Sequence, residues 1–202
     1  MIAIPDHNAM SPQDYLDWEE QQTIKYEYLN GEAYAMTGGT LNHNAIAVNL
    51  TTALRTFLRG KGCKVFMADA KVEVSENGPF FYPDVVVSCD EQDLRALRQV
   101  QHPCLIIEVL SPSTEAFDRG KKFRHYRRLD SLKEYVLVNG ETKGVECYRL
   151  NDRNKWELTA YIPEEQTEAS EVSLEVQFTS IDFQCPLSLV YEEVELVTSE
   201  EE

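Results

Sequence analysis

The chain has 202 residues, of which 43% are hydrophobic, and its formal net charge is −16. This apolar fraction suits one domain with a real hydrophobic core. No run of 18 apolar residues occurs, and the first residues lack the basic and apolar regions of a signal peptide, so we expect neither a membrane span nor secretion.

Five cysteines are spread along the chain without a C-x-x-C pair. An odd number at wide spacing argues against a disulfide framework and against a zinc site. Cys89 and Cys104 flank or lie in apolar runs, so we expect both to be buried, reduced thiols. This cysteine usage favours a cytoplasmic protein.

The charge is distributed unevenly along the chain. Residues 141–202 hold 16 acidic residues against four basic ones, whereas residues 119–133 hold seven of Lys or Arg. The net negative charge argues against a generic nucleic-acid-binding surface, because phosphate contacts need cations. The basic segment nevertheless allows phosphate to bind locally while the rest of the molecule repels it.

The first half of the chain predicts two helices, a β-hairpin and two further strands. Ser11 followed by Pro12 is a helix-start signal, and Asn30-Gly31 favours a tight hairpin turn because both residues accept positive φ. Within the third strand Asp69 and Lys71 share a face, and we expect an ion pair between them. The expected elements are a helix over 12–22, strands over 26–29 and 32–36, a helix over 41–59, and strands over 65–74 and 80–88.

The second half predicts mainly strands, with one helix. The run 104–110 is almost continuously apolar, which is typical of a strand buried on both faces. We expect one domain, comprising a core over about 24–150, a β extension over about 151–195 and a solvated acidic tail over 196–202. The expected elements are a short helix or loop over 90–100, a helix over 118–129, strands over 135–139, 144–150, 156–161 and 172–178, and segments 181–183 and 186–190 that cover a sheet edge or form a dimer contact.

Two acids stand where an acid is costly. Asp84 begins the β-branched run Val85-Val86-Val87, and Glu108 interrupts the run Leu-Ile-Ile-Glu-Val-Leu. An ionised carboxylate buried without a partner loses its hydration, so a metal, a cation or a hydrogen-bond network must compensate it. On neighbouring strands the two carboxylates can converge, and Mg²⁺ takes one or two carboxylates while keeping several waters.

Asp118, Lys122 and Tyr126 follow at a spacing of four and therefore share one face of the expected helix. One interpretation is a surface Asp–Lys pair worth about 0.3–0.5 kcal/mol. The other is a site in which Lys122 orients a water or stabilises charge on a phosphate, with Tyr126 offering its hydroxyl at the edge.

The ordered set of motifs resembles a known family. Pro83-Asp84, Glu108-Val109 and a following lysine are similar to the PD-(D/E)xK nuclease pattern. The closer resemblance is to the Uma2 family (DUF820), and it runs from about Tyr26 to about Tyr148. The residues that carry it are Tyr28-Leu29-Asn30-Gly31-Glu32, His43, Pro83-Asp84, Glu108-Val109-Leu110-Ser111-Pro112-Ser113-Thr114, Asp118-x-x-x-Lys122-x-x-x-Tyr126 and Glu134-Tyr135-Val136-Leu137-Val138.

This resemblance implies an α/β fold with a restriction-endonuclease-like core, in which helices flank a mixed central β-sheet. It also implies hydrolysis of DNA phosphodiester bonds that depends on Mg²⁺ or Mn²⁺. The general nuclease pattern places its lysine two residues after the second acid, where this chain has Leu110. The family resemblance moves the lysine to the next helix, where Lys122 matches best and Lys121 is the alternative.

The resemblance assigns further roles to individual residues. Asp84, Glu108 and the backbone carbonyl of Val109 would hold the metal. Glu32 and His43 are candidates of second rank, since an acid on a hairpin strand is equally well an exposed residue and a histidine near a helix start is often a cap. DNA would bind along residues 119–133, and a homodimer is expected by analogy with nucleases of this fold.

Two other interpretations stay open. A catalytically inactive nuclease fold could serve as a binding or regulatory module, which Leu110 and the negative charge favour. Alternatively, Asp84, Glu108 and Lys122 form a buried ion-pair network without metal. An open cleft around these three side chains would support the nuclease, and a closed one would support the ion-pair network.

Overall fold

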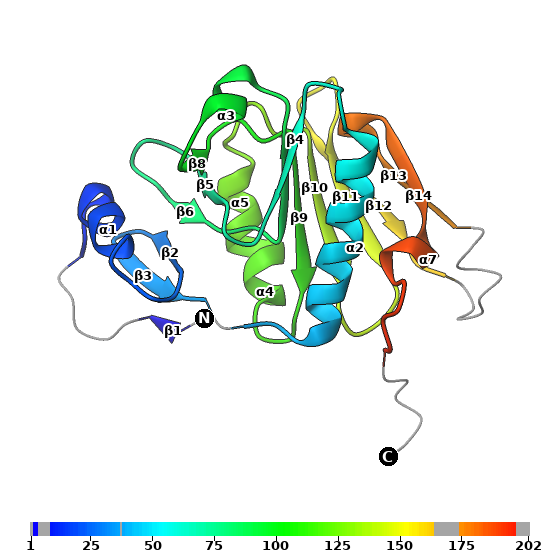
Figure 1. Ribbon diagram of the computed structural model, residues 1–202, viewed down its shortest axis with the longest axis horizontal. Helices are drawn as coiled ribbons and strands as arrows, with labels where there is room; N and C mark the ends of the chain where they lie inside the picture. The colour runs from blue at the N-terminus through cyan, green and yellow to red at the C-terminus, as the bar shows by residue number, and fades with distance from the viewer. Residues whose placement is uncertain (1, 4–8, 37, 164–173, 197–202) are drawn as a thin grey trace, which may run out of the picture.

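The centre of the molecule is a six-stranded mixed sheet that helices cover on both faces (Figure 1). The computed structural model describes residues 2–3, 9–36, 38–163 and 174–196, with side chains from residue 9 onward. β9 and β10 are parallel and the other neighbours are antiparallel, so the expected α/β fold with a mixed sheet is confirmed. The strands, in spatial order, are β12 (Trp156–Tyr161), β11 (Val145–Leu150), β10 (Glu134–Asn139), β9 (Leu105–Leu110), β7 (Val85–Ser88) and β4 (Lys64–Met67).

Strand β9 is buried along its whole length, as its apolar run predicts. Side chains alternate between the two faces of a strand, so Ile107 contributes to the core under helix α2 (Leu41–Phe57) and Ile106 to the core on the other face. Glu108 therefore points to the same side as Ile106. That side is covered by helix α5 (Phe123–Tyr126) and the turns before it, which lie to the left of β9 in Figure 1, whereas α2 lies to its right.

A second sheet forms the N-terminal side of the molecule, at the left of Figure 1. Its hairpin turns at Asn30 and Gly31, whose φ angles of 53° and 90° confirm the predicted turn. Helix α1 (Pro12–Glu19) packs against the hairpin and begins with a capping box from Ser11 and Asp14. The strands, in spatial order, are β1 (Ile2–Ala3), β3 (Glu32–Ala35), β2 (Tyr26–Leu29), β6 (Phe80–Phe81), β5 (Lys71–Glu73) and β8 (Gln99–Val100).

One bent ribbon joins the two sheets. The sequence predicts single strands over 65–74 and 80–88, but each is broken: β4 and β7 pair in the central sheet, and β5 and β6 pair in the second. The breaks lie opposite each other, where the Ala68 N–H donates to the Asp84 carbonyl at 3.1 Å. Pro83 cannot donate to a ladder, and Ala68 takes a φ of 48°, so regular pairing stops there. This bend places Asp84 at the junction of the sheets.

The bend also makes the predicted Asp69–Lys71 ion pair wrong. Lys71 is buried on β5 and its ammonium lies 3.2 Å from Glu19 Oε2 of helix α1. Asp69 is exposed in the bend itself. Alternation along one strand cannot apply where the backbone leaves the β conformation.

The helix predicted over 118–129 is not one regular α-helix. Helix α4 (Glu115–Phe117) leads into a π-helical turn over Asp118–Lys122, and α5 ends at Tyr126. A π-helical turn inside a helix inserts extra backbone and is frequent at functional sites. Helix α2 begins at Leu41, as predicted, with Thr40 as its N-cap, and it ends at Phe57, two residues before the predicted end.

The C-terminal segment packs on the α2 side of the central sheet. Strands β13 (Glu175–Phe178) and β14 (Phe183–Pro186) form a small sheet, at the right of Figure 1, that continues into helix α7 (Leu187–Val190). Leu187 and Val190 are fully buried in the core that α2 shares. Residues 186–190 therefore pack in the core on the α2 face of the sheet and do not cover a sheet edge, whereas the dimer contact stays a prediction. Residues 172–173 of the expected strand and the tail 197–202 lie outside the described residues.

The prediction that Cys89 is a reduced thiol is wrong, because it forms a disulfide with Cys63. Cys63 precedes β4 and Cys89 follows β7, and these strands are antiparallel with Lys64 opposite Ser88. The strand register therefore brings together two cysteines that lie 26 residues apart in the chain. Cys104 is free and partly buried.

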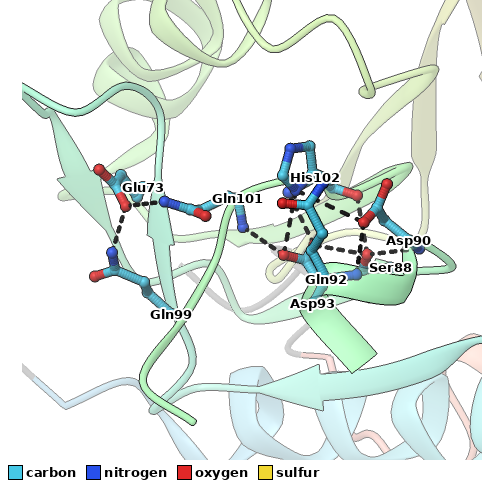
Figure 2. Close-up of polar contacts among 8 residues, drawn as sticks. All are labelled: Glu73, Ser88, Asp90, Gln92, Asp93, Gln99, Gln101 and His102. Atoms are coloured by element: carbon cyan, nitrogen blue, oxygen red, sulfur yellow. Dashed lines mark hydrogen bonds and ion pairs between the residues drawn. The ribbon is translucent and has the colours of Figure 1, made fainter. Parts of the chain in front are cut away.

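A buried carboxylate fixes the segment between β7 and β9 (Figure 2). Asp93, in helix α3 (Glu91–Arg95), accepts backbone N–H groups of Gln101 at 2.9 Å and His102 at 2.8 Å, and its Oδ2 lies 2.7 Å from Ser88 Oγ. The Ser88 hydroxyl also lies 2.9 Å from the His102 carbonyl rather than against its imidazole. The Ser–His–Asp grouping in Figure 2 therefore fastens a loop and is not a nucleophile with its base.

Candidate active site

A pocket of about 320 Å³ opens where the bent ribbon, the N-terminal hairpin and the turn after β9 meet. Asp84 comes from the bend, Glu108 from the central strand and Lys122 from the end of the π-helical turn. The pocket is lined by Glu27, Ala35, Met36, Gly38, Gly39, Thr40, His43, Tyr82, Asp84, Glu108, Val109, Ser111, Pro112, Ser113, Thr114, Phe117, Asp118 and Lys122.

Asp84 is held in place by its neighbours across the ribbon. Its Oδ2 accepts the backbone N–H of Val109 at 2.7 Å, which fixes the carboxylate beside the end of β9. The same oxygen lies 3.3 Å from His43 Nε2, in the first turn of α2. The hydrogen bond to Asp84 raises the pKa of His43 and outweighs the partial burial that lowers it.

Glu108 and Lys122 form a buried ion pair. Their side chains are 4% and 6% exposed, and Lys122 Nζ lies 2.9 Å from Glu108 Oε1. The Tyr126 hydroxyl donates to the same oxygen at 3.3 Å. Burial raises the pKa of Glu108 well above its usual value, even though Lys122 opposes the shift. Burial alone would lower the pKa of Lys122, but the carboxylates of Glu108, Glu27 and Asp118 together raise it well above its usual value.

The π-helical turn brings Asp118 to the same ammonium. Asp118 Oδ1 lies 3.7 Å from Lys122 Nζ, and the carbonyl of Asp118 accepts the Tyr135 hydroxyl at 3.0 Å. Burial raises the pKa of Asp118, against the opposing effect of Lys122. The predicted common face of Asp118, Lys122 and Tyr126 is thus confirmed, and it faces the interior rather than solvent.

Glu27 is a site residue that the sequence analysis missed. It lies on β2 of the second sheet, is 5% exposed, and places Oε1 2.9 Å from Lys122 Nζ. The same oxygen accepts the backbone N–H of Tyr82 at 3.1 Å. The available signal was alternation: Glu27 shares a face with buried Leu29, whereas Tyr26 and Tyr28 face the core beneath α1.

Of the other predicted site residues, some line the pocket and others do not. His43 and Val109 line the pocket. Tyr126 is fully buried behind Glu108, so it packs its ring and touches the site only through its hydroxyl. Glu32 is exposed, accepts the Tyr34 hydroxyl and does not line the pocket, so the structure does not bring it to the site.

The donor chemistry of the pocket fits a hard divalent cation. Four carboxylates face the pocket, from Glu27, Asp84, Glu108 and Asp118, against the single ammonium of Lys122. Within the described residues no three His, Cys, Asp or Glu side chains are grouped to hold a metal ion by themselves. Mg²⁺ suits such a site, since it binds through one or two carboxylates and keeps several waters.

The basic segment beside the site is largely exposed. Lys121, Arg124, Arg127 and Arg128 reach solvent around helix α5. Arg119 is only partly exposed, and it pairs with Glu115 at 2.7 Å and with Glu146 at 2.6 Å.

The mixed central sheet with helices on both faces is the architecture expected of a restriction-endonuclease-like fold, and Asp84, Glu108 and Lys122 meet at one pocket of it. The family model of Uma2, described as "Putative restriction endonuclease", matches residues 12–187. The chain therefore belongs to the Uma2 family. In the described part of the chain, every helix is too short or too polar to cross a bilayer.

Similar proteins agree with this assignment. The chain is 39% identical to "Uncharacterized protein slr1290" of Synechocystis over 82% of its own length and 87% of that protein's. It is 33% identical to "Uncharacterized protein sll1609" of the same organism over 81% and 94%. A crystal structure of "a putative nuclease belonging to DUF820" from Anabaena variabilis superposes with a TM-score of 0.72 at 14% identity, covering 90% of this chain and 97% of that one. The last comparison establishes the fold alone.

Proposed function

We propose that this protein is a metal-dependent endonuclease that hydrolyses phosphodiester bonds of DNA. The observation that carries the proposal is that Asp84, Glu108 and Lys122, which lie far apart in the sequence, line one open pocket. The pocket stays open at Asp84 and His43, whose side chains are 23% and 21% exposed, while Glu108 and Lys122 lie at its buried end. Membership of the Uma2 family, whose model is described as "Putative restriction endonuclease", supports the proposal.

Asp84 and Glu108 would hold Mg²⁺ or Mn²⁺, with the carbonyl of Val109 as a further ligand. A divalent cation supplies Lewis acidity toward a phosphoryl oxygen and lowers the pKa of a bound water. Asp84 is already oriented for this task by the Val109 N–H. The contacts of Glu108 with Lys122 and Tyr126 both use Oε1, and its second oxygen is the one proposed to face the cation.

Lys122 would act as a permanent cation and not as a general base. In the metal-free protein the surrounding carboxylates raise the pKa of Lys122, which favours its protonated form. A protonated amine can donate hydrogen bonds to a phosphoryl oxygen or orient the attacking water, and its charge stabilises the negative charge that develops. The general nuclease pattern places its lysine two residues after the second acid. Lys122, at the end of the π-helical turn, would take over the role of that lysine.

His43 would contribute a second positive group when protonated. Its side chain is 21% exposed at the pocket, and Asp84 raises its pKa. The exposed cations Lys121, Arg124 and Arg128 would contact the DNA backbone outside the pocket.

A second candidate function is a nuclease fold that binds nucleic acid without cutting it. The leucine at position 110, where the general nuclease pattern has its lysine, favours it. The two functions are separated by incubating supercoiled plasmid with the wild-type protein and Glu108→Gln in Mg²⁺. Nicking by the wild type that the variant lacks is the result expected of the endonuclease; retention of the plasmid in a gel shift without any nicking would favour the binding module.

A further inference from the structure

Glu27 reaches the site from a different sheet than the proposed metal ligands. Its strand β2 belongs to the N-terminal hairpin, whereas Asp84 and Glu108 lie at the bend and in the central sheet. Its Oε1 is anchored by the Tyr82 N–H at 3.1 Å and contacts Lys122 Nζ at 2.9 Å. Glu27 is thus a buried carboxylate whose charged partner is the lysine.

Lys122 is shared equally between two carboxylates, because Nζ lies 2.9 Å from Glu27 Oε1 and 2.9 Å from Glu108 Oε1. A divalent cation on Glu108 would compete with the ammonium for the same carboxylate and repel it across a short distance in a site of low dielectric. Glu27 would still hold the ammonium after that, since its anchor at Tyr82 does not involve the cation.

We propose that Glu27 is a positioning residue, which keeps the Lys122 ammonium at the reacting phosphate while Glu108 carries the metal. This inference rests on the proposed nuclease function. It explains how a lysine supplied by the helix, and not by the strand of the second acid, stays in the pocket. It also gives the N-terminal hairpin a part in the site.

The test is a double-mutant cycle of Glu27→Gln and Lys122→Met, followed by plasmid cleavage in Mg²⁺. A displaced catalytic group costs on the order of 100-fold in rate, so Glu27→Gln should lower kcat about 100-fold with little change in KM. In the Lys122→Met background Glu27→Gln should have no further effect, because the group it positions is gone. Glu32→Gln, on the same hairpin but outside the pocket, is the matched control and should cleave as the wild type does.

Calorimetric titration with Mg²⁺ supplies a readout besides activity. Glu27→Gln should bind Mg²⁺ within about threefold of the wild type, whereas Glu108→Gln should lose at least about tenfold, a typical loss at a metal site. Wild-type kcat in Glu27→Gln, an equal loss in both backgrounds, or loss of Mg²⁺ binding in Glu27→Gln would each overturn the positioning role. A wild type that neither binds Mg²⁺ nor cleaves would overturn the nuclease function itself. If Glu27→Gln does not fold, Glu27→Asp keeps the charge one methylene short and should show a smaller loss of the same kind.

A separate observation concerns three cysteines at the opposite end of the same strands. Cys63 and Cys89 form a disulfide, and the Cys104 thiol sulfur lies 3.8 Å from the Cys89 sulfur. Cys89 is exposed, so small thiols can reach the disulfide. The residues stand at the ends of β4, β7 and β9, three adjacent strands of the central sheet.

We infer that Cys89 exchanges its disulfide partner between Cys63 and Cys104. The Cys104 thiolate attacks the Cys89 sulfur, the Cys63–Cys89 bond breaks, and Cys63 leaves as a thiolate that takes up the proton Cys104 lost, so that no external oxidant is consumed. The exchange moves the covalent link from the β4–β7 pair to the β7–β9 pair and leaves the edge strand β4 held by its hydrogen bonds with β7.

Peptide mapping by mass spectrometry without reduction tests the exchange. With oxidised glutathione as the oxidant, Cys63→Ser should form the Cys89–Cys104 disulfide, and Cys104→Ser should keep only Cys63–Cys89. In wild type equilibrated in a mixture of reduced and oxidised glutathione, both disulfides should be recovered. Cys185→Ser, a buried cysteine elsewhere, is the control and should leave the pattern unchanged. Folded Cys63→Ser that forms no Cys89–Cys104 bond would overturn the inference.

Discussion

Asp84 accepts the backbone N–H of Val109 at 2.7 Å, and this contact ties the bend of one ribbon to the end of the central strand. It holds the Asp84 carboxylate beside Val109, which is the residue that follows Glu108. This hydrogen bond depends on the break in strand pairing at Pro83 and Ala68. If the strand had continued regularly, its backbone at the break would have formed ladder hydrogen bonds. The site is thus assembled by an irregularity in the sheet.

Replacing Asp84 by Asn should weaken metal binding and leave the free energy of unfolding nearly unchanged. The amide oxygen can still accept the Val109 N–H, so the free energy of unfolding should stay within about 1 kcal/mol of the wild type. The charge that a hard cation requires is lost, and DNA cleavage should fall at least about 100-fold. Urea unfolding and plasmid nicking measure the two quantities. A variant that cleaves at the wild-type rate would remove Asp84 from the site.

Replacing Lys122 by Met should destabilise the metal-free protein. The change leaves Glu27, Glu108 and Asp118 buried without their cation, and breaking such a buried pair costs about 3–5 kcal/mol. Mg²⁺ should restore part of the loss by replacing the missing positive charge. Urea unfolding at neutral pH with and without Mg²⁺ measures both effects.

Lys121 is the matched control for that experiment, because it is adjacent in sequence but exposed. Lys121→Met should change the free energy of unfolding by less than about 0.5 kcal/mol, as at ordinary surface positions. It should also leave kcat unchanged. If Lys121→Met rather than Lys122→Met abolished cleavage, the assignment of the lysine would be reversed.

The exposed cations around α5 should determine the salt dependence of DNA binding. Each lost phosphate contact reduces the slope of log K against log salt by about 0.9, so Lys121→Ala/Arg124→Ala/Arg128→Ala should reduce it by about 2 to 3. Fluorescence anisotropy with a DNA duplex at several salt concentrations measures the slope. The triple variant of Arg59, Arg153 and Lys155 to Ala removes the same charge from exposed positions elsewhere, and it should keep the wild-type slope. Equal slopes in both triple variants would place the DNA elsewhere.

The alkylation rate of Cys104 should keep rising to an unusually high pH. Burial is the main reason that its pKa is raised to about 11, and Glu134 adds to the shift. Alkylation requires the thiolate, so its rate should rise about tenfold for each pH unit from 7.5 to 9.5, whereas a thiol of ordinary pKa, about 8.5, would level off within that range. Iodoacetamide labelling followed by mass spectrometry gives the rate at Cys104 separately from the buried Cys147 and Cys185. A plateau near pH 9 would contradict the assigned environment.

Much of the site could be predicted from the sequence because it violates local rules. A glutamate within the run Leu-Ile-Ile-Glu-Val-Leu and an aspartate at the head of three valines needed partners, and both acids line the pocket. The spacing of Lys122 to Asp118 and Tyr126 was also compatible with a surface pair, and the adjacent acids and the family resemblance favoured a role in the site. The π-helical turn preserves the spacing closely enough to keep all three residues on the buried face.

The missed features all depend on contacts between distant segments. Glu27 is flanked by tyrosines, and its burial requires the second sheet to meet the π-helical turn. The Cys63–Cys89 disulfide depends on the register of β4 against β7, and the bend depends on an alanine with positive φ, for which the sequence carries no signal. Glu32 shares the face of Glu27 but lies at the end of the hairpin, where it is exposed and accepts the Tyr34 hydroxyl.

The measurement that tests the central claim most directly is calorimetric titration of Mg²⁺ and Mn²⁺ into the wild type, Asp84→Asn and Glu108→Gln, with plasmid cleavage by the same samples. We predict one divalent cation bound by the wild type, binding weakened at least about tenfold in each folded variant, and cleavage lost along with it. A wild type that binds neither ion would contradict a metal-dependent nuclease and leave the buried charges around Lys122 as a structural ion-pair network.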